Sequence, residues 1–302
     1  MITLNSDKGL VKIESWEDIE QLPGFVTDMN PSDHKLEAII GRYAFKDKIK
    51  CGLSNCRTLH GKGYIAKTED GRSTNIGKDC GKNYFGVEFE TLSKKFERDV
   101  TESENRDRLW SFSFQLDELE QKLDNFRCQK RGADWVYKKS RPLVSLGSGC
   151  PEEIVHRISA MVKARTTTLN LQRPATETEI ETLEAMQGRK VQRPHAIDEP
   201  IANIAGLQVL YPENDLKELL VNDLVINIKS FKSNDIDSLT FEELRYWTKW
   251  VSSIENTMEK AANAVVLGNS LLSQSNLDPL ARLLSKREDL SLFRSFLKSL
   301  TT

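Results

Sequence analysis

From Val87 onward, apolar residues recur at intervals of three and four, the period of an amphipathic α-helix. One run ends at Phe96 and the next begins at Leu109, with the charged segment 101–108 between them. This segment contains no apolar residue, so either one long helix crosses solvent there or two helices turn back on each other. The second run predicts the seam of a long amphipathic helix or short coiled coil, with packing inside the monomer as the alternative. The seam residues are Leu109, Phe112, Leu116, Leu119, Leu123 and Phe126.

Start and stop signals place the later helices. Pro151 opens one helix to about Leu169, and Thr176–Glu179 is a capping box for a second that ends at Gly188, so the pair predicts a helical hairpin. Residues 132–149 have the composition of an irregular connector with room for one strand. After the proline-rich segment 189–212, helices are predicted over 214–231, from the capping box at Thr240 to Val265, and from Asn276 to Leu300, which together form a helical bundle.

The amino-terminal part has shorter patterns. Two β-branched runs, 1–4 and 10–13, predict a hairpin, and a short helix follows before Pro23-Gly24. Pro31–Ile40 resembles a capped helix ended at Gly41, and 42–50 a strand. Asp70-Gly71 between the runs 63–68 and 72–76 is a strong hairpin signal. Gly77–Cys80 then leads into a helix.

Three of the five cysteines and one of the four histidines fall between residues 51 and 80, in the pattern Cys51-x4-Cys56-x3-His60-x19-Cys80. Thiolate and imidazole are the ligands of tetrahedral structural Zn²⁺. The sequence therefore predicts a structural zinc site in which four protein ligands leave no position for a reactive water. The alternative is that His60 and Cys80 are ordinary polar and core residues.

A knuckle, a β-hairpin and a helix carrying a ligand resemble the treble-clef group of zinc fingers over about residues 46–90. The match is to a variant, because three ligands precede the hairpin and only Cys80 follows it. The strings 51–56 and 74–82 also resemble those of uncharacterised bacterial proteins of phage-related or mobile elements, a resemblance that implies no activity. Treble-clef-like fingers mostly bind nucleic acid or proteins, and this resemblance implies the same choice here.

Charge is distributed unevenly. The chain has a net charge of −2, but residues 42–83 carry ten Lys/Arg against four Asp/Glu. A second basic stretch, 127–141, interleaves six basic residues with two aromatic ones. Basic side chains can contact phosphates and aromatic rings can stack on unpaired bases, although solvated surface is the alternative for both stretches. The nucleic-acid-binding candidates are Lys48, Lys50, Arg57, Lys62, Arg72, Lys78, Lys82, Lys130, Arg131, Trp135, Tyr137, Lys138 and Lys139.

Other chemistry is weakly represented. Gly71–Asp79 misses the phosphate-loop pattern, because five residues separate its glycines and Asp79 replaces the hydroxyl. A helix beginning near Gly77 would still point amides and Lys78 toward an anion, with structural glycines as the alternative. Spacing alone assembles no catalytic residues, so we expect a protein that is not an enzyme, while an active site that meets only in the fold stays open.

Together these patterns predict a mainly α protein with a small N-terminal α+β zinc-binding module, helical hairpins and a C-terminal helical bundle. The expected division is 1–86 zinc module, 87–131 long helix, 132–188 connector and hairpin, 189–212 linker and 213–302 bundle. The odd, sparse cysteines favour a reducing cytoplasm, and no apolar run is long enough for a membrane span. The expected function is nucleic-acid binding with a helical scaffold for protein partners or self-association. The alternative is a protein-interaction adaptor or inhibitor, such as one in phage or mobile-element conflict, with purely structural zinc.

Overall fold

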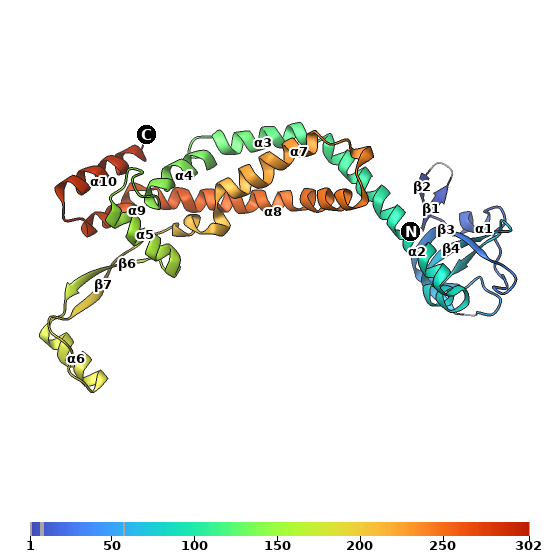
Figure 1. Ribbon diagram of the computed structural model, residues 1–302, viewed down its shortest axis with the longest axis horizontal. Helices are drawn as coiled ribbons and strands as arrows, with labels where there is room; N and C mark the ends of the chain where they lie inside the picture. The colour runs from blue at the N-terminus through green and yellow to red at the C-terminus, as the bar shows by residue number, and fades with distance from the viewer. Residues whose placement is uncertain (1, 7–8, 57, 302) are drawn as a thin grey trace. The chain divides into compact units, whose positions relative to one another are not determined.

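The computed structural model describes residues 2–6, 9–56 and 58–301 (Figure 1). The chain forms two compact units, each continuous in space but not in sequence. Unit 1 contains the residues up to Ser111 together with Asp235–Thr248, and unit 2 contains Phe112–Asn234 together with Lys249–Thr302. The fold is mainly helical with a small antiparallel sheet, as expected, and a second two-stranded sheet makes it a mixed α/β protein. None of the helices among the described residues is long and apolar enough to span a membrane.

Unit 1 is built on a five-stranded antiparallel sheet with the order β2-β1-β3-β4-β5. Both predicted hairpins are confirmed, one at each edge of the sheet, and the short helix α1 (Glu17–Glu20) follows the first. The strands are β1 (Ile2–Ser6), β2 (Gly9–Ile13), β3 (Leu36–Lys50), β4 (Leu59–Thr68) and β5 (Ser73–Ile76).

The helix expected over residues 31–40 is wrong, because β3 begins at Leu36. Leu36 and Ile39 are buried in the core on one face of the sheet, while Ile40 packs against the core on the other. A strand covered on both faces loses the alternation of apolar and polar residues, so its apolar run cannot be told from a buried helix by periodicity. Pairing with β1 and β4, which no local pattern reveals, decides for the strand.

Helix α2 (Lys78–Ser113) packs on the sheet through Phe89, Phe96 and Val100, all buried in one core cluster with the cysteines of the candidate metal site. Gly86, at φ 57°, interrupts the helix once. The charged segment 101–108 is helical throughout, so the chain does not turn back there. A single helix through both apolar runs is nevertheless wrong, because α2 ends at Ser113 and the next helix begins at Leu116. Much of the segment 101–108 is half-buried, and Arg106 donates a hydrogen bond to the Ile236 carbonyl within the same unit.

Unit 2 is helical, and the predicted helices after residue 150 are confirmed with different ends. Inside it, Phe112, Phe231 and Trp250 make edge-on ring contacts from three separate segments, with the Phe112 centroid 5.4 Å from that of Phe231 and 5.8 Å from that of Trp250. The π-helical stretch Lys217–Val225 continues into α7. The helices are α3 (Leu116–Cys128), α4 (Ala133–Ser140), α5 (Glu152–Ala164), α6 (Glu177–Gln187), α7 (Ile226–Lys232), α8 (Phe241–Leu271, from Lys249 onward in unit 2), α9 (Gln274–Leu277) and α10 (Arg287–Ser299).

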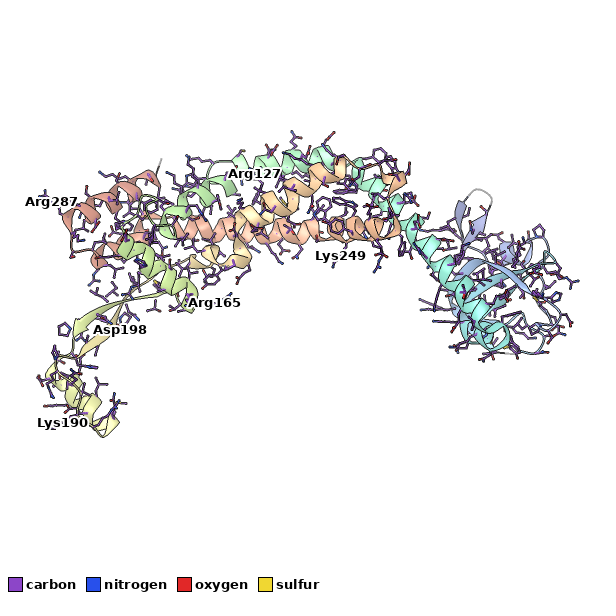
Figure 2. The ribbon with its side chains drawn as sticks, viewed as in Figure 1. Arg127, Arg165, Lys190, Asp198, Lys249 and Arg287 are labelled. Carbon is purple, nitrogen blue, oxygen red and sulfur yellow. The ribbon has the colours of Figure 1, made fainter. Side chains whose placement is uncertain are left out.

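Two local expectations in unit 2 are wrong. The connector 132–149 contains helix α4 where a strand was allowed. The predicted helical hairpin is interrupted, because α5 ends at Ala164 and β6 (Thr168–Pro174) follows it. β6 pairs with β7 (Ala196–Asn203), which lies inside the expected linker. The capping box at Thr176 is confirmed, but α6 follows β6 and precedes β7 in the sequence. The two strands and α6 form an arm, residues 168–203, with α6 at its tip; Lys190 and Asp198 mark it in Figure 2.

The prolines explain why the arm was not predicted. Proline is rare inside sheets because it cannot donate a ladder hydrogen bond. In a two-stranded ribbon each strand has one unpaired edge, so Pro174 and Pro200 are tolerated. Pro200 lies opposite Asn170, at the register irregularity between Leu169 and Asn170. Pro200 therefore lies in a strand of this ribbon, although the proline-rich composition of residues 189–212 did not predict one.

Candidate metal centre

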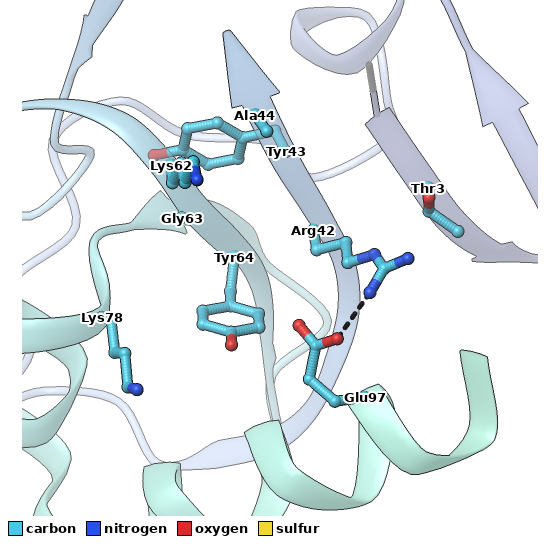
Figure 3. A pocket seen from close by; sticks show the side chains of 9 residues that line it. All are labelled: Thr3, Arg42, Tyr43, Ala44, Lys62, Gly63, Tyr64, Lys78 and Glu97. Atoms are coloured by element: carbon cyan, nitrogen blue, oxygen red, sulfur yellow. Dashed lines mark hydrogen bonds and ion pairs between the residues drawn. The ribbon is translucent and has the colours of Figure 1, made fainter. Parts of the chain in front are cut away.

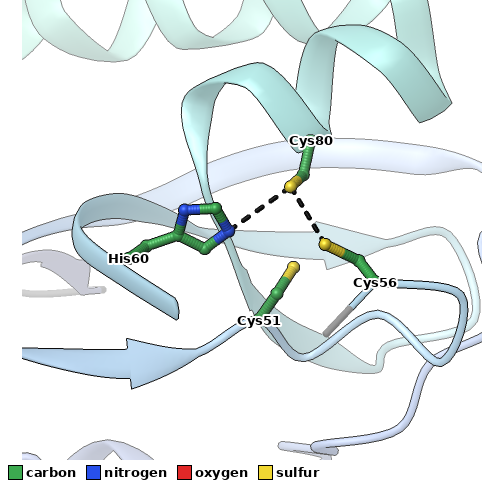
Figure 4. A group of neighbouring side chains, drawn as sticks. All are labelled: Cys51, Cys56, His60 and Cys80. Carbon is green, nitrogen blue, oxygen red and sulfur yellow. Dashed lines mark hydrogen bonds between the residues drawn. The ribbon is translucent and has the colours of Figure 1, made fainter. Parts of the chain in front are cut away.

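Cys51, Cys56, His60 and Cys80 lie together, and their ligand atoms are all within 4.8 Å of one another (Figure 4). The Cys56 and Cys80 sulfur atoms are 3.1 Å apart, and the Cys80 sulfur is 3.3 Å from His60 Nε2. Four ligands about 2.3 Å from a central ion in a tetrahedron would stand roughly 3.8 Å apart. The observed group is close to that spacing without the ion, so the residues could hold one metal.

The loop after β3 contributes two ligands, and β4 and α2 contribute one each. Cys51 follows β3, Cys56 closes the loop after it, His60 is the second residue of β4, and Cys80 lies in the first turn of α2. All three cysteines are buried. The group therefore joins strand, loop and helix at one point, and Cys80 returns to the earlier ligands because the β4–β5 hairpin turns the chain back.

Hydrogen bonds fix the loop that carries the first two ligands. The Cys51 amide donates to the Thr58 carbonyl at 2.9 Å, and the Gly52 amide donates to the Asn75 carbonyl at 2.8 Å. The Asn75 side chain in turn donates to the Lys50 carbonyl at 2.8 Å. Asn75 is 1 % exposed, so this bond is shielded from water and holds β5 against the end of β3. These hydrogen bonds hold the loop, and a bound metal would tie it to His60 and Cys80.

Glycine at position 77 is required by the histidine ligand. A Cβ atom there would lie 2.3–2.5 Å from three atoms of the His60 ring. Gly52 is similar, since its Cβ would lie 2.0 Å from the Thr74 hydroxyl. Both glycines are therefore required by packing. For Gly77, this favours a structural role over the binding of an anion by the Gly71–Asp79 segment.

The thiols have unequal pKa values. Burial raises the pKa of Cys51, and burial together with the neighbouring thiols raises the pKa of Cys80 to about 12. Burial also opposes ionisation of Cys56, but hydrogen bonds from Thr58 and the neighbouring thiols outweigh it and lower that pKa to about 7. Burial lowers the pKa of His60 and so favours the neutral imidazole that a metal requires.

These donors fit Zn²⁺. Three crowded, buried sulfur atoms cannot all carry negative charge without a cation between them, and a divalent ion supplies that charge. A Cys3His set fills the four tetrahedral positions of structural zinc and leaves none for a reactive water. A Zn²⁺ ion held by these four residues would therefore stabilise this part of unit 1.

The predicted basic residues near the metal centre lie mostly at the surface. Arg72 pairs with Asp70 at 3.3 Å and Lys82 with Glu90 at 2.9 Å, so these two cations are partly neutralised. Arg57 lies outside the described residues. Lys67 pairs with Glu37 at 2.9 Å. Five other lysines of this segment are exposed and make no salt bridge within the part of the chain that the structure describes: Lys46, Lys48, Lys50, Lys62 and Lys78.

The second basic stretch is used inside unit 2. Arg131 donates to the Leu300 carbonyl at 3.1 Å and Lys139 to the Ser299 carbonyl at 2.8 Å, so both bind the carboxyl end of α10. The Arg131 guanidinium also lies 5.2 Å from the Trp135 ring centroid, and Arg141 lies 5.7 Å from that of Tyr137. Lys130 and Lys138 are exposed. Nucleic-acid contact by this stretch stays a prediction.

Sequence reasoning missed a cavity of about 380 Å³ on unit 1 (Figure 3). Arg42, Lys62 and Tyr64 line it from β3 and β4, and Lys78 and Glu97 from α2. A Lys-x-Tyr alternation on one strand was the available signal, because residues two apart share a face of a sheet. That Lys62 and Tyr64 lie beside residues of α2 depends on the tertiary structure.

No family model, curated protein or solved structure matches this chain. The residues themselves define a candidate four-ligand cysteine–histidine metal centre in a small module of sheet and helix.

Proposed function

We propose that this chain is a non-enzymatic, zinc-finger-type protein in which a structural Zn²⁺ holds a basic module that binds nucleic acid. The observation that carries the proposal is the set of exposed lysines without salt bridges around the cysteine–histidine group. Surface cations without internal partners are free to replace the counterions of a phosphate backbone, which supplies most of the affinity in non-specific nucleic-acid binding. The resemblance to treble-clef fingers supports the same function.

The zinc would act as a clamp. It would tie the loop after β3 to the first turn of α2 and so keep the lysines of both on one small module. Metal binding in comparable modules supplies about 10–16 kcal/mol of apparent folding free energy. Removing the metal with a chelator should therefore abolish nucleic-acid binding, because the module loses its shape while the lysines remain.

Fluorescence anisotropy with single- and double-stranded DNA and RNA at several salt concentrations tests the proposal. The variant Lys46→Gln/Lys48→Gln/Lys50→Gln removes three of the unpaired cations from β3. If each contacts one phosphate, the slope of log affinity against log salt should become shallower by about two to three. The matched control, Lys217→Gln/Lys229→Gln/Lys260→Gln, removes the same charge from exposed positions of unit 2 and should keep the slope. Absence of binding at low salt refutes the proposal.

A protein-interaction adaptor is the second candidate, and a groove on unit 2 favours it. The groove has a volume of about 540 Å³, and five of its nine lining residues are apolar: Phe112, Leu119 of α3, and Val251, Ile254 and Met258 of α8. The nearby Phe114 is 83 % exposed. Light scattering and pull-down with wild type and Leu119→Asp test this function. A strict monomer that retains no partner, or retention that Leu119→Asp leaves unchanged, counts against it.

A further inference from the structure

The cavity on unit 1 has a charge that its own residues do not balance. Arg42 donates to Glu97 at 2.6 Å and to Glu104 at 3.0 Å, so its charge is satisfied by two carboxylates. Lys62 and Lys78 also line the cavity and make no salt bridge among the residues described. The unbalanced charge of the wall is therefore that of the two lysines, which have no carboxylate partner among the residues described.

Lys78 is placed where a lysine has no structural advantage. It is the first residue of α2, and the amino end of a helix carries partial positive charge and amides without helical partners. A cation there is unfavourable, whereas an anion is stabilised by both the amides and the lysine. The helix end and the two lysines therefore favour the same kind of ligand, one with negative charge.

Tyr64 adds an aromatic wall. Its ring makes an edge-on contact with buried Phe89 at 5.7 Å between centroids, which holds it in place. In the view of Figure 3, Tyr64 lies between Lys78 and the Arg42–Glu97 pair. The volume of about 380 Å³ is within the range of roughly 300–1,000 Å³ for small-ligand pockets. Cations beside a fixed aromatic ring are the combination that binds an unpaired nucleotide.

We propose that this cavity holds the terminal phosphate of a nucleic-acid strand, with Lys62 and Lys78 contacting the phosphate and Tyr64 lying against the adjoining nucleoside. A terminal phosphate monoester carries about −1.5 to −2 charges at pH 7, close to the unbalanced charge of the wall. An internal phosphodiester carries only one charge, so the cavity favours strand ends. The inference rests on the proposed nucleic-acid function and adds to it a preference for one chemical end group.

The test compares one fluorescent single-stranded oligonucleotide in three forms: with a 5′-phosphate, with a 3′-phosphate and with neither. One phosphorylated form should bind about ten-fold more tightly than the unphosphorylated strand, through charge-assisted hydrogen bonds to the two lysines. Lys62→Gln/Lys78→Gln should remove this difference. The control Lys67→Gln/Lys95→Gln takes one lysine from the same strand and one from the same helix, outside the cavity, and should retain it.

Each result has a distinct meaning. Equal affinity of wild type for all three strands overturns the strand-end inference and leaves the proposed function intact, whereas no binding of any strand refutes the proposed function itself. A nucleoside monophosphate that binds as tightly as the phosphorylated strand identifies a free nucleotide as ligand and also overturns the inference. Zinc content and melting temperature are measured for both double variants. Both quantities should match those of wild type, because Lys62→Gln/Lys78→Gln changes no metal ligand.

Discussion

Replacing Gly77 with alanine tests the metal centre without touching a ligand. The added Cβ would lie 2.3–2.5 Å from three His60 ring atoms, about 1 Å closer than carbon atoms pack comfortably. Metal–ligand distances hold to about ±0.2 Å, so an imidazole displaced by about 1 Å is lost as a ligand. Since changes to groups that merely orient a ligand already cost about 10–100-fold in metal affinity, Gly77→Ala should weaken zinc binding by at least about 100-fold.

Competition with a chromophoric chelator measures the zinc affinity, and thermal unfolding of the metal-loaded protein measures the accompanying loss of stability. The matched control is Gly61→Ala, next to His60 on β4, where the new Cβ would meet only the Phe45 carbonyl oxygen, at 3.2 Å, among the residues described. His60→Ala should resemble Gly77→Ala in zinc affinity. Wild-type affinity in Gly77→Ala would refute the assignment of His60 as a ligand.

Three further predictions concern pH and capping. Zinc affinity should fall at least about 100-fold from pH 7 to pH 6 in chelator competition, because burial raises the pKa of Cys80 to about 12 and also that of Cys51, and both must lose a proton to bind metal. Release of clearly fewer than two protons per bound metal contradicts this prediction. Thr240→Ala should lower the free energy of unfolding by about 1 kcal/mol in urea denaturation, while Thr240→Ser preserves the bond between the hydroxyl and the Glu243 amide; equal losses exclude the cap. The hydrogen bond from Arg173 lowers the pKa of Glu179 to about 2, so the contribution of this pair to folding stability is present above pH 4.5 and is lost as the pH falls toward 2. Arg173→Gln should raise the pKa of Glu179 in a carboxyl NMR titration. An unchanged pKa contradicts the pairing.

Local signals predicted much of the structure. The metal ligands could be proposed because spacing, residue type and the Asp70-Gly71 turn all lie within thirty residues, and their meeting depends on one hairpin. The capping boxes at Thr176 and Thr240 were equally local, since their hydrogen bonds join residues three apart. The expected five-part domain division and the cytoplasmic location stay predictions.

Errors occurred where distant partners decide. Residues 36–40 form a strand because β1 and β4 pair with β3, and Pro200 lies in a strand because β6 pairs with β7. The carboxyl end of α10 is a partner of Arg131 and Lys139 that no local pattern revealed, while phosphate contact by these residues stays a prediction. A basic residue shows its charge in sequence, but whether that charge is already balanced depends on neighbours more than a hundred residues away.

The sequence by itself determined a four-ligand cysteine–histidine group in a basic segment and a long helical remainder, because ligand chemistry and helical period are properties of near neighbours. Only the tertiary structure decided which lysines lack internal partners and that Lys62, Tyr64 and Lys78 line one cavity. Those facts depend on the packing of α2 against the sheet, where residues from two strands and a helix meet. The metal centre is thus encoded locally, whereas the surface through which it would act is a product of the fold.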